Sequence, residues 1–258
     1  MKRLFVVLAL GLAACGSGGT RIVVAAGTTV VDPGLMDRVA VAYERSHPGV
    51  EVSVVGDSTS RVFVLARNGE ADVTVTHHPE LEADFRDEAV IDRRVFESRF
   101  LLVGPSERAT EITGSEASAA LATIAAEGWT FVTRNDGSGT HRAERLLWER
   151  AGIDPDGSDW YLETGQGMGL TLQVASQRAA FTIAEEGTFL EAEKSLDLVE
   201  VPLLGGMPPN TYVAMAVADS RVVDAATAFV EWLSSREGAT AIVEAQPGPD
   251  GVVYRPLP

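Results

Sequence analysis

Cysteine is almost absent from this sequence. Cys15 is the one cysteine in 258 residues, so an internal disulfide is impossible, and a lone unmodified thiol is unusual in an exported protein. Basic residues are also scarce, since 21 Lys and Arg stand against 37 Asp and Glu, a formal net charge of −16. Binding to phosphate backbones depends on Lys and Arg, so we expect no nucleic-acid partner. Long apolar runs are missing after the first residues, so no later segment is predicted to cross a membrane.

The N-terminus has the layout of an export signal. Met1-Lys2-Arg3 is positively charged, and Leu4 to Leu12 is an apolar run too short to span a bilayer as a mature helix. Leu12-Ala13-Ala14-Cys15 resembles the lipobox of bacterial lipoproteins, in which cleavage precedes a cysteine that is then acylated. We predict a signal peptide over residues 1–14, a lipid on Cys15 and a flexible tether over residues 15–20, which anchor an exported protein to the membrane. The alternative is an ordinary secretory signal with an incidental cysteine.

Strand-like and helix-like segments alternate along the rest of the chain. Apolar, β-branched runs over 21–26, 50–55 and 71–76 predict strands, and the segments between them predict helices over 35–47 and 58–68. This β-α-β-α-β order predicts a parallel sheet covered by helices on both faces. Later segments are expected as a charged helical stretch from Pro79 to about Glu97, helices over 115–127, 140–151, 222–233 and 235–245, a helix after Gly169, and strands over 100–103, 129–133, 181–184, 198–202 and 212–217.

The resulting fold class is α/β with two lobes, each a mostly parallel sheet flanked by helices. Residues 21–103 and 212–258 are predicted to form the first lobe, and residues 104–211 the second lobe, inserted into it. A hydrophobic content of 45% is ample for the cores of two such lobes.

Four polar or glycine-rich turns lie where a predicted strand gives way to a helix. They are Gly27-Thr28-Thr29, Ser58-Thr59-Ser60, Asp136 to Thr140, and Gly165 to Gly169 with Thr171. Ligands of open α/β sheets bind beyond the carboxyl ends of the strands, where helix N-termini offer free N–H groups and the positive end of the helix dipole. One such turn is an ordinary helix cap. Four facing one cleft predict a site for a compact anion, and Arg134 beside the third turn is either a surface residue or a bidentate donor to that anion.

Two catalytic or metal alternatives are weak. Ser138 lies three residues before His141, which invites a hydrolase interpretation, but its glycines are immediately adjacent rather than in the G-x-S-x-G spacing, and no carboxylate is indicated to orient the histidine. His77 and His78 are adjacent on a strand end and point to opposite faces, so they do not easily bind one metal ion. We therefore predict neither catalysis nor a metal site.

Longer stretches resemble a known family. The matching segments include "NGEADVTVTHHP", "FVTRNDGSGTHRAERLLWERAGI", "WYLETGQGMGLTL" and "FTIAEEGTFL". They resemble the tungstate-binding solute receptors of bacterial ABC importers, which have the type II periplasmic binding-protein fold. The resemblance implies a non-catalytic, monomeric receptor without a cofactor, which closes on a tetrahedral oxyanion, tungstate or molybdate, and delivers it to the permease and ATPase subunits of an importer.

The resemblance also implies the residues that hold the anion. They are Thr28, Thr29, Ser58, Thr59, Ser60, Arg134, Ser138, Gly139, Thr140, Met168, Gly169 and Thr171, and His77 matches the family's histidine at a strand end. The chain departs from the family in its first loop, which has fewer hydroxyl groups, and in its second, where Arg61 follows Ser60. A phosphate or sulfate receptor, a sensor module without a transporter and an exported serine hydrolase using Ser138 are the alternatives. A phosphate receptor benefits from a carboxylate that accepts the ligand's proton, and Asp57 and Asp136 are the nearby candidates.

Overall fold

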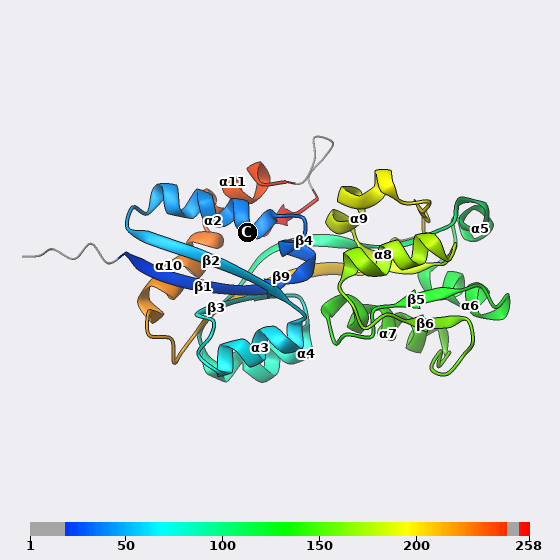
Figure 1. The fold of residues 1–258 in the computed structure, drawn as a ribbon, viewed down its shortest axis with the longest axis horizontal. Helices are drawn as coiled ribbons and strands as arrows, with labels where there is room; N and C mark the ends of the chain where they lie inside the picture. The colour runs from blue at the N-terminus through cyan, green and yellow to red at the C-terminus, as the bar shows by residue number, and fades with distance from the viewer. Residues whose placement is uncertain (1–18, 247–252) are drawn as a thin grey trace, which may run out of the picture.

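The computed structural model describes residues 19–246 and 253–258, which form two lobes side by side (Figure 1). The predicted signal peptide and the lipidation site at Cys15 lie outside the described residues. Thr20, assigned to the tether, already begins the first strand. In the described part of the chain, no helix is long and apolar enough to span a membrane.

The sheet of the first lobe is built around β1. β1 (Thr20–Gly27) pairs in parallel with β2 (Val50–Asp57) and β3 (Val73–Thr76), as the sequence predicts. β9 (Pro209–Val217) then pairs antiparallel with β3, followed by β4 (Ala89–Gly104) and β10 (Arg255–Pro256), also antiparallel. The α/β class is confirmed. The expectation of a mostly parallel sheet is wrong beyond β3, because β4 and β9 form a long antiparallel pair rather than a helix-linked parallel one.

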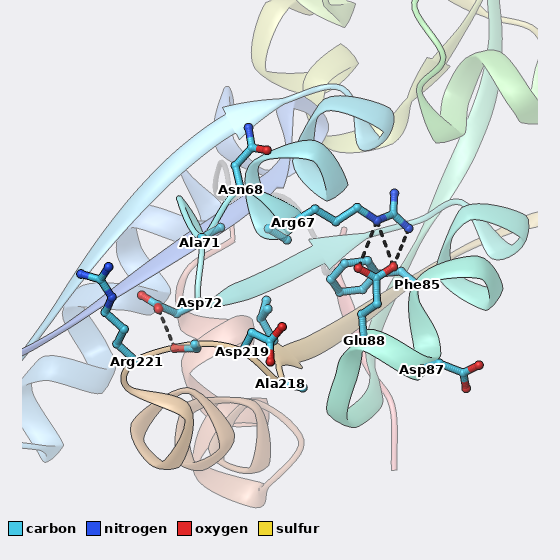
Figure 2. Close-up of a pocket in the computed structure, with 14 residues that line it drawn as sticks. Arg67, Asn68, Ala71, Asp72, Phe85, Asp87, Glu88, Ala218, Asp219 and Arg221 are labelled. Carbon is cyan, nitrogen blue, oxygen red and sulfur yellow. Dashed lines mark hydrogen bonds and ion pairs between the residues drawn. The ribbon is translucent and has the colours of Figure 1, made fainter.

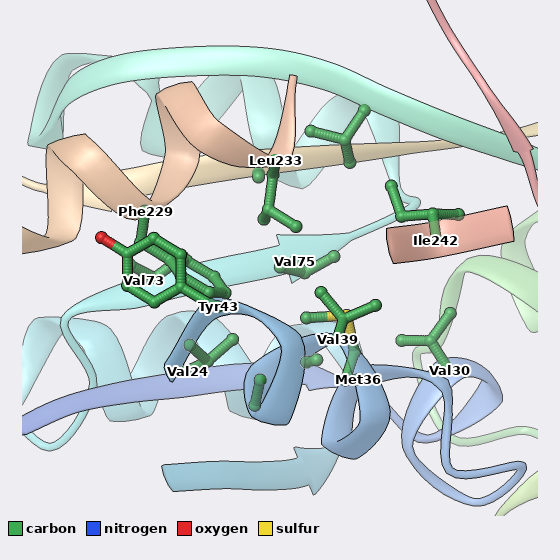
Figure 3. Close-up of a cluster of buried hydrophobic side chains, with 14 of the residues drawn as sticks. Val24, Val30, Met36, Val39, Tyr43, Val73, Val75, Phe229, Leu233 and Ile242 are labelled. Atoms are coloured by element: carbon green, nitrogen blue, oxygen red, sulfur yellow. The ribbon is translucent and has the colours of Figure 1, made fainter. Parts of the chain in front are cut away.

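Helices cover both faces of this sheet. α2 (Leu35–Ser46), α10 (Val223–Leu233) and α11 (Arg236–Glu244) lie on one face, and α3 (Thr59–Arg67) and α4 (Pro79–Phe85) on the other (Figure 1). Met36, Val39 and Tyr43 share one face of α2 because their spacing follows the helical period, and they pack against the strands and Phe229 of α10 (Figure 3). This core holds the strands whose carboxyl ends begin the site.

The second lobe contains α5 (Ser106–Ile112), α6 (Ala117–Ala126), β5 (Phe131–Thr133), α7 (Gly139–Ala151), β6 (Tyr161–Glu163), α8 (Met168–Gln177), β7 (Thr182–Glu185), α9 (Glu186–Ala192) and β8 (Val199–Glu200). β5 and β6 pair in parallel, whereas β7 and β8 pair antiparallel with the end of β4. Separate apolar clusters around Trp148 and around Leu172 form the interior of this lobe.

β4 passes from one lobe to the other. Its residues up to Arg99 pair with β9, and those from Phe100 to Gly104 pair with β7 and β8. The predicted helical stretch to Glu97 is wrong after α4 and its following turn, because the segment from Ala89 is strand. The division into residues 21–103 with 212–258 and residues 104–211 stays a prediction, and the change of pairing partners lies a few residues before its first boundary.

Candidate ligand-binding site

Three of the four predicted turns meet between the lobes. α1 (Thr28–Val31) directly follows β1, α3 follows β2, and α7 follows the turn after β5. Ser60 at the start of α3 donates a hydrogen bond to the carbonyl oxygen of Gly137 (3.1 Å). Nη2 of Arg134 donates to Oγ1 of Thr28 (3.2 Å). These two bonds join the first lobe to the turn that precedes α7.

Glycines allow the helix ends to approach closely. A Cβ atom on Gly139 would lie 2.3 Å from the carbonyl oxygen of His77, so the start of α7 lies against the end of β3. A Cβ on Gly167, the N-cap of α8, would lie 3.9 Å from Oγ1 of Thr28. The fourth turn therefore lies beside α1, and all four helix N-termini face one region between the lobes.

Arg134 is the central cation of this region, and its side chain is only 2% exposed. Its Nε and Nη2 donate to Oδ2 of Asp136 at 3.0 and 2.5 Å. Asn135 and Gly137 have left-handed backbone angles (φ 43° and 69°), which turn the chain so that Asp136 returns to the guanidinium. Nη1 of Arg134 is buried without a hydrogen-bond partner among the described residues. One edge of the guanidinium is thus fixed, and the other retains free donors.

Two buried hydroxyl groups of the site also lack protein partners. Thr59 and Thr140 are each 1% exposed, and their Oγ1 atoms have no hydrogen-bond partner within residues 19–246 and 253–258. Buried polar groups are almost always paired, because an unpaired one costs about 1–3 kcal/mol. No side chain caps the N-terminus of α1, α3 or α8. The region therefore offers an anion several unused donors and the positive ends of four helices.

The carboxylates near the site are occupied or exposed. Asp136 uses Oδ2 for Arg134, and its Oδ1 accepts the N–H of Ser138 (3.1 Å). Asp57 accepts the N–H of Ser58 (2.8 Å) and lies at the solvent-accessible side of the turn. Asp32 follows α1, where partial burial raises the pKa of its carboxyl and the charge of Arg134 opposes that rise. Asp136 thus has a hydrogen bond on each carboxylate oxygen, whereas Asp57 is open to solvent on its Oδ2 side.

His77 belongs to a buried polar network next to Thr29. Its Nδ1 lies 2.6 Å from Oδ1 of Asn210, and its ring stacks on Tyr212 with centroids 4.8 Å apart. Oγ1 of Thr29 lies 2.9 Å from the Tyr212 hydroxyl and 3.4 Å from Nε2 of His77. Burial lowers the pKa of His77 to about 4, so its imidazole is neutral at physiological pH.

The remaining predicted residues border the site as helix N-caps or through backbone groups. Ser138 is the N-cap of α7 and accepts the N–H of His141 (3.2 Å), while Ser58 is the N-cap of α3. Met168 is fully buried in the core of the second lobe, and the hydroxyl of Thr171 donates to the carbonyl of Gly167 (3.0 Å). Gly169 is partly buried, and a Cβ atom on it would meet open space, so α8 presents its N–H groups rather than these side chains.

Sequence reasoning missed Asp32, Asn210, Tyr212 and Tyr254. Tyr254 donates its hydroxyl to the carbonyl oxygen of Thr29 (2.9 Å) from a segment more than 200 positions later. The available signal was in β9, where Asn210 and Tyr212 are two residues apart. Alternate residues of a strand point to one face, so a polar pair at this spacing in an otherwise apolar strand indicates a buried polar contact.

A surface pocket of about 580 Å³ lies elsewhere, between the end of α3, the turn after α4 and the loop after β9 (Figure 2). Arg67 and Glu88 form an ion pair in it (2.8 Å), and Asp72 accepts the hydroxyl of Ser220 (2.6 Å). None of the predicted ligand-binding residues lines this pocket. The interlobe region, where the predicted residues gather, therefore remains the candidate site.

Comparisons with known proteins agree with this architecture. A family model described as the PBP (periplasmic binding protein) superfamily domain matches residues 15–237. A Haloferax volcanii protein described as a candidate ABC transporter anion-binding protein is 38% identical over 240 residues, covering 88% of this chain and 70% of its own. The tungstate-binding protein TupA of Peptoclostridium acidaminophilum is 31% identical over 237 residues, covering 86% and 80%.

A solved structure has the same fold. The crystal structure of the tungstate ABC transporter from Geobacter sulfurreducens superposes with a TM-score of 0.79 and 32% identity, covering 87% of this chain and 98% of that one. These relatives are named for binding and transport, in agreement with the prediction that the chain is not an enzyme. With its two lobes, its interlobe helix N-termini and a family match over most of its length, the chain belongs to the periplasmic binding protein superfamily.

Proposed function

We propose that this protein is the solute-binding component of an ABC importer and captures a tetrahedral oxyanion, tungstate or molybdate, between its lobes. The observation that carries the proposal is the set of buried donors without protein partners: Nη1 of Arg134 and the hydroxyls of Thr59 and Thr140. They come from both lobes: Thr59 and Thr140 lie at the N-termini of α3 and α7, and Arg134 lies in the turn between β5 and α7. An oxyanion supplies an acceptor to each of them and a counter-charge to the guanidinium.

The occupied carboxylate of Asp136 favours a fully ionised anion over phosphate. Both oxygens of Asp136 already accept hydrogen bonds, from Arg134 and from the backbone of Ser138. Hydrogen phosphate would bring a proton that needs an acceptor, whereas tungstate and molybdate bring only acceptors at neutral pH. The relatives from P. acidaminophilum and G. sulfurreducens are also named for tungstate. A donor-rich site therefore supports tungstate or molybdate as the ligand.

The hydrolase alternative has no geometric support. Oγ of Ser138 accepts the backbone N–H of His141, and Nδ1 of His141 accepts the N–H of Gly137 (3.3 Å). The histidine ring therefore does not act on the serine hydroxyl, as a general base would. Both side chains stabilise the start of α7 instead.

The proposed function includes a place in the cell and partners. We propose that the protein is exported, that the lipid on Cys15 holds it at the membrane, and that it acts as a monomer. Its partners are then the permease and ATPase subunits of the importer, which receive the anion when the lobes open. The relatives named for ABC transport support the importer, and the lipobox-like sequence before Cys15 supports the anchor.

Calorimetry on the mature protein tests the proposal with tungstate, molybdate, sulfate and phosphate. We expect tungstate and molybdate to bind, and Arg134→Ala to lose roughly 2–5 kcal/mol of binding free energy, the range for removing one partner of a buried charged contact. Arg145→Ala is the matched control, since Arg145 lies on the helix that follows the Arg134 turn and pairs with Asp156. Absence of binding to all four anions, or an unchanged affinity of Arg134→Ala, would contradict the proposal.

A further inference from the structure

Asn210 holds a fixed position between the lobes at the start of β9, with a side chain that is 2% exposed. Its Nδ2 donates to Oγ of Ser98 (3.1 Å) and to the hydroxyl of Tyr212 (3.0 Å). An amide nitrogen has two hydrogens, so both are used. Its Oδ1, 2.6 Å from Nδ1 of His77, can only accept. The ring proton of His77 is therefore on Nδ1, and Nε2 carries a lone pair.

Tyr212 extends this order toward the site. Its hydroxyl accepts a hydrogen from Asn210 and has one hydrogen of its own, and we assign Oγ1 of Thr29, 2.9 Å away, as the acceptor of that hydrogen. Tyr212 is fully buried, and burial raises the pKa of its hydroxyl well above the usual value, so it keeps this hydrogen. Oγ1 of Thr29 therefore accepts its hydrogen bond from Tyr212 and not from a ligand.

The hydroxyl hydrogen of Thr29 is then left to point away from Tyr212. Among the described residues, the other hydrogen-bonding neighbour of Oγ1 of Thr29 is Nε2 of His77, 3.4 Å away. This nitrogen carries no hydrogen, so it can only accept. A separation of 3.4 Å is long for an O–H donor, whose usual range is about 2.5–3.0 Å. The Thr29 hydroxyl can therefore donate its hydrogen to an anion oxygen at a shorter distance than to His77.

We infer that Asn210 is a positioning residue that fixes, through Tyr212, the hydroxyl of Thr29 as a donor to the bound anion, and so selects fully ionised oxyanions over protonated ones. The inference rests on the proposed function and deepens it. A tungstate oxygen accepts the Thr29 hydrogen. The hydroxyl group of hydrogen phosphate needs an acceptor instead, and a Thr29 hydroxyl held as a donor does not supply one, so a buried hydrogen-bonding mismatch weakens binding.

Asn210→Asp reverses the order of the hydrogen bonds. At pH 8 the ionised carboxylate accepts from both His77 and Tyr212, so Tyr212 turns its hydrogen to residue 210. Thr29 then donates to Tyr212 and presents its lone pairs to the ligand. The added charge weakens every dianion similarly, so the informative quantity is the ratio of affinities for tungstate and hydrogen phosphate, both dianions at this pH. Calorimetry and competition against tungstate measure it.

We expect the ratio of tungstate to hydrogen-phosphate affinity to fall by about tenfold to a hundredfold in Asn210→Asp, the range for a buried hydrogen-bonding mismatch. Asn68→Asp adds the same charge at an exposed position of the same lobe and is expected to leave the ratio unchanged. An Asn210→Asp protein that binds both anions more weakly by the same factor would overturn the inference.

A second variant and a spectroscopic measurement cover the case in which Asn210→Asp does not fold. Tyr212→Phe removes the hydrogen that Thr29 accepts, so the Thr29 hydroxyl can act toward the ligand as either a donor or an acceptor. The ratio of tungstate to hydrogen-phosphate affinity is then expected to fall by a smaller factor than in Asn210→Asp. In the wild type, ¹⁵N chemical shifts are expected to place the proton of the His77 ring on Nδ1. A ratio unchanged in Tyr212→Phe, or a proton on Nε2, contradicts the inference. Absence of tungstate binding to the wild type contradicts the proposed function instead.

Discussion

At the scale of single residues, Gly139 determines how closely the two lobes approach. A Cβ at this position would lie 2.3 Å from the carbonyl oxygen of His77. Gly139→Ala therefore forces α7 away from the end of β3. We expect the free energy of unfolding to fall by about 1–3 kcal/mol, the usual cost of overpacking, and tungstate affinity to fall with it because Thr140 moves. Urea unfolding and calorimetry measure the two effects.

Gly169 supplies the contrast to Gly139. Nothing lies within 4 Å of a Cβ on Gly169, so Gly169→Ala is expected to leave the free energy of unfolding unchanged or slightly increased. Because Gly169 is a predicted ligand-binding residue at the start of α8, its substitution tests the site alone. Equal stability of Gly139→Ala and the wild type would show that α7 adjusts freely, contrary to the packing against His77.

The sequence indicated the residues of the turns but not those that arrive from elsewhere in the chain. Thr59, Arg134 and Thr140 lie in or beside turns that predict an anion site because four such turns recur along the chain. Asn210 and Tyr212 reach Thr29 from positions more than 180 residues away, and their spacing in β9 was the only local signal. Cap geometry was equally hidden, since it is the three-dimensional turn that makes Ser138 an acceptor for the backbone of α7.

At the scale of secondary-structure elements, Glu144 anchors α7 to the strands beneath the site. Its buried carboxylate accepts hydrogen bonds from Thr133 of β5 (2.9 Å), Tyr161 of β6 (2.5 Å) and Trp148 (3.3 Å). Burial raises the pKa of Glu144 from 4.5 to about 7 despite these donors. The helix that carries Thr140 and the strand that leads to Arg134 are thus joined by one ionisable group.

This shift predicts how stability depends on pH. The folded state binds the Glu144 proton more tightly than the unfolded state, so the free energy of unfolding falls as pH rises from about 4.5 to 7. Glu144→Gln is expected to flatten that fall by on the order of 1–3 kcal/mol. Glu185, whose pKa burial also raises to about 7, and Glu82, whose pKa burial raises, contribute to the slope that remains. Urea unfolding at several pH values measures the slope. A slope identical to that of the control Glu149→Gln, exposed on the same helix, would contradict the assignment.

The periodicity of apolar residues predicted most helices and strands, but it failed for the first part of β4, where many residues are charged. The segment from Ala89 to Arg99 carries acidic and basic residues at a density typical of a solvated helix, yet it forms the first part of β4. Its pairing with β9 determines the outcome, since Val95 and Phe96 are buried while Arg93 and Arg94 are exposed. Tertiary pairing of this kind overrides local propensity and cannot be seen in the segment itself. The short elements α5 and β6 were missed because each offers too few residues for a pattern.

At the scale of the whole molecule, the two lobes are linked by chain crossings and by contacts at the rim of the site. β4 contributes residues to the sheets of both lobes, and β9 returns beside it from the second lobe. Paired strands of this kind can bend without breaking their hydrogen bonds, so they suit a hinge. Contacts across the rim, by contrast, have to break when the lobes separate. Their strength therefore affects how long a ligand is retained.

The ion pair between Glu80 of α4 and Arg142 of α7 is such a contact. Both side chains are partly exposed, so the pair contributes about 0.2–1 kcal/mol, and less at high salt. Because separation of the lobes would break this contact between α4 and α7, Glu80→Arg and Arg142→Glu are each expected to raise the dissociation rate of tungstate severalfold. The double exchange restores the attraction and is expected to return the rate toward that of the wild type. Stopped-flow dissociation at low and high salt measures this double-mutant cycle, and effects that simply add in the double variant would show that the pair does not hold the lobes together.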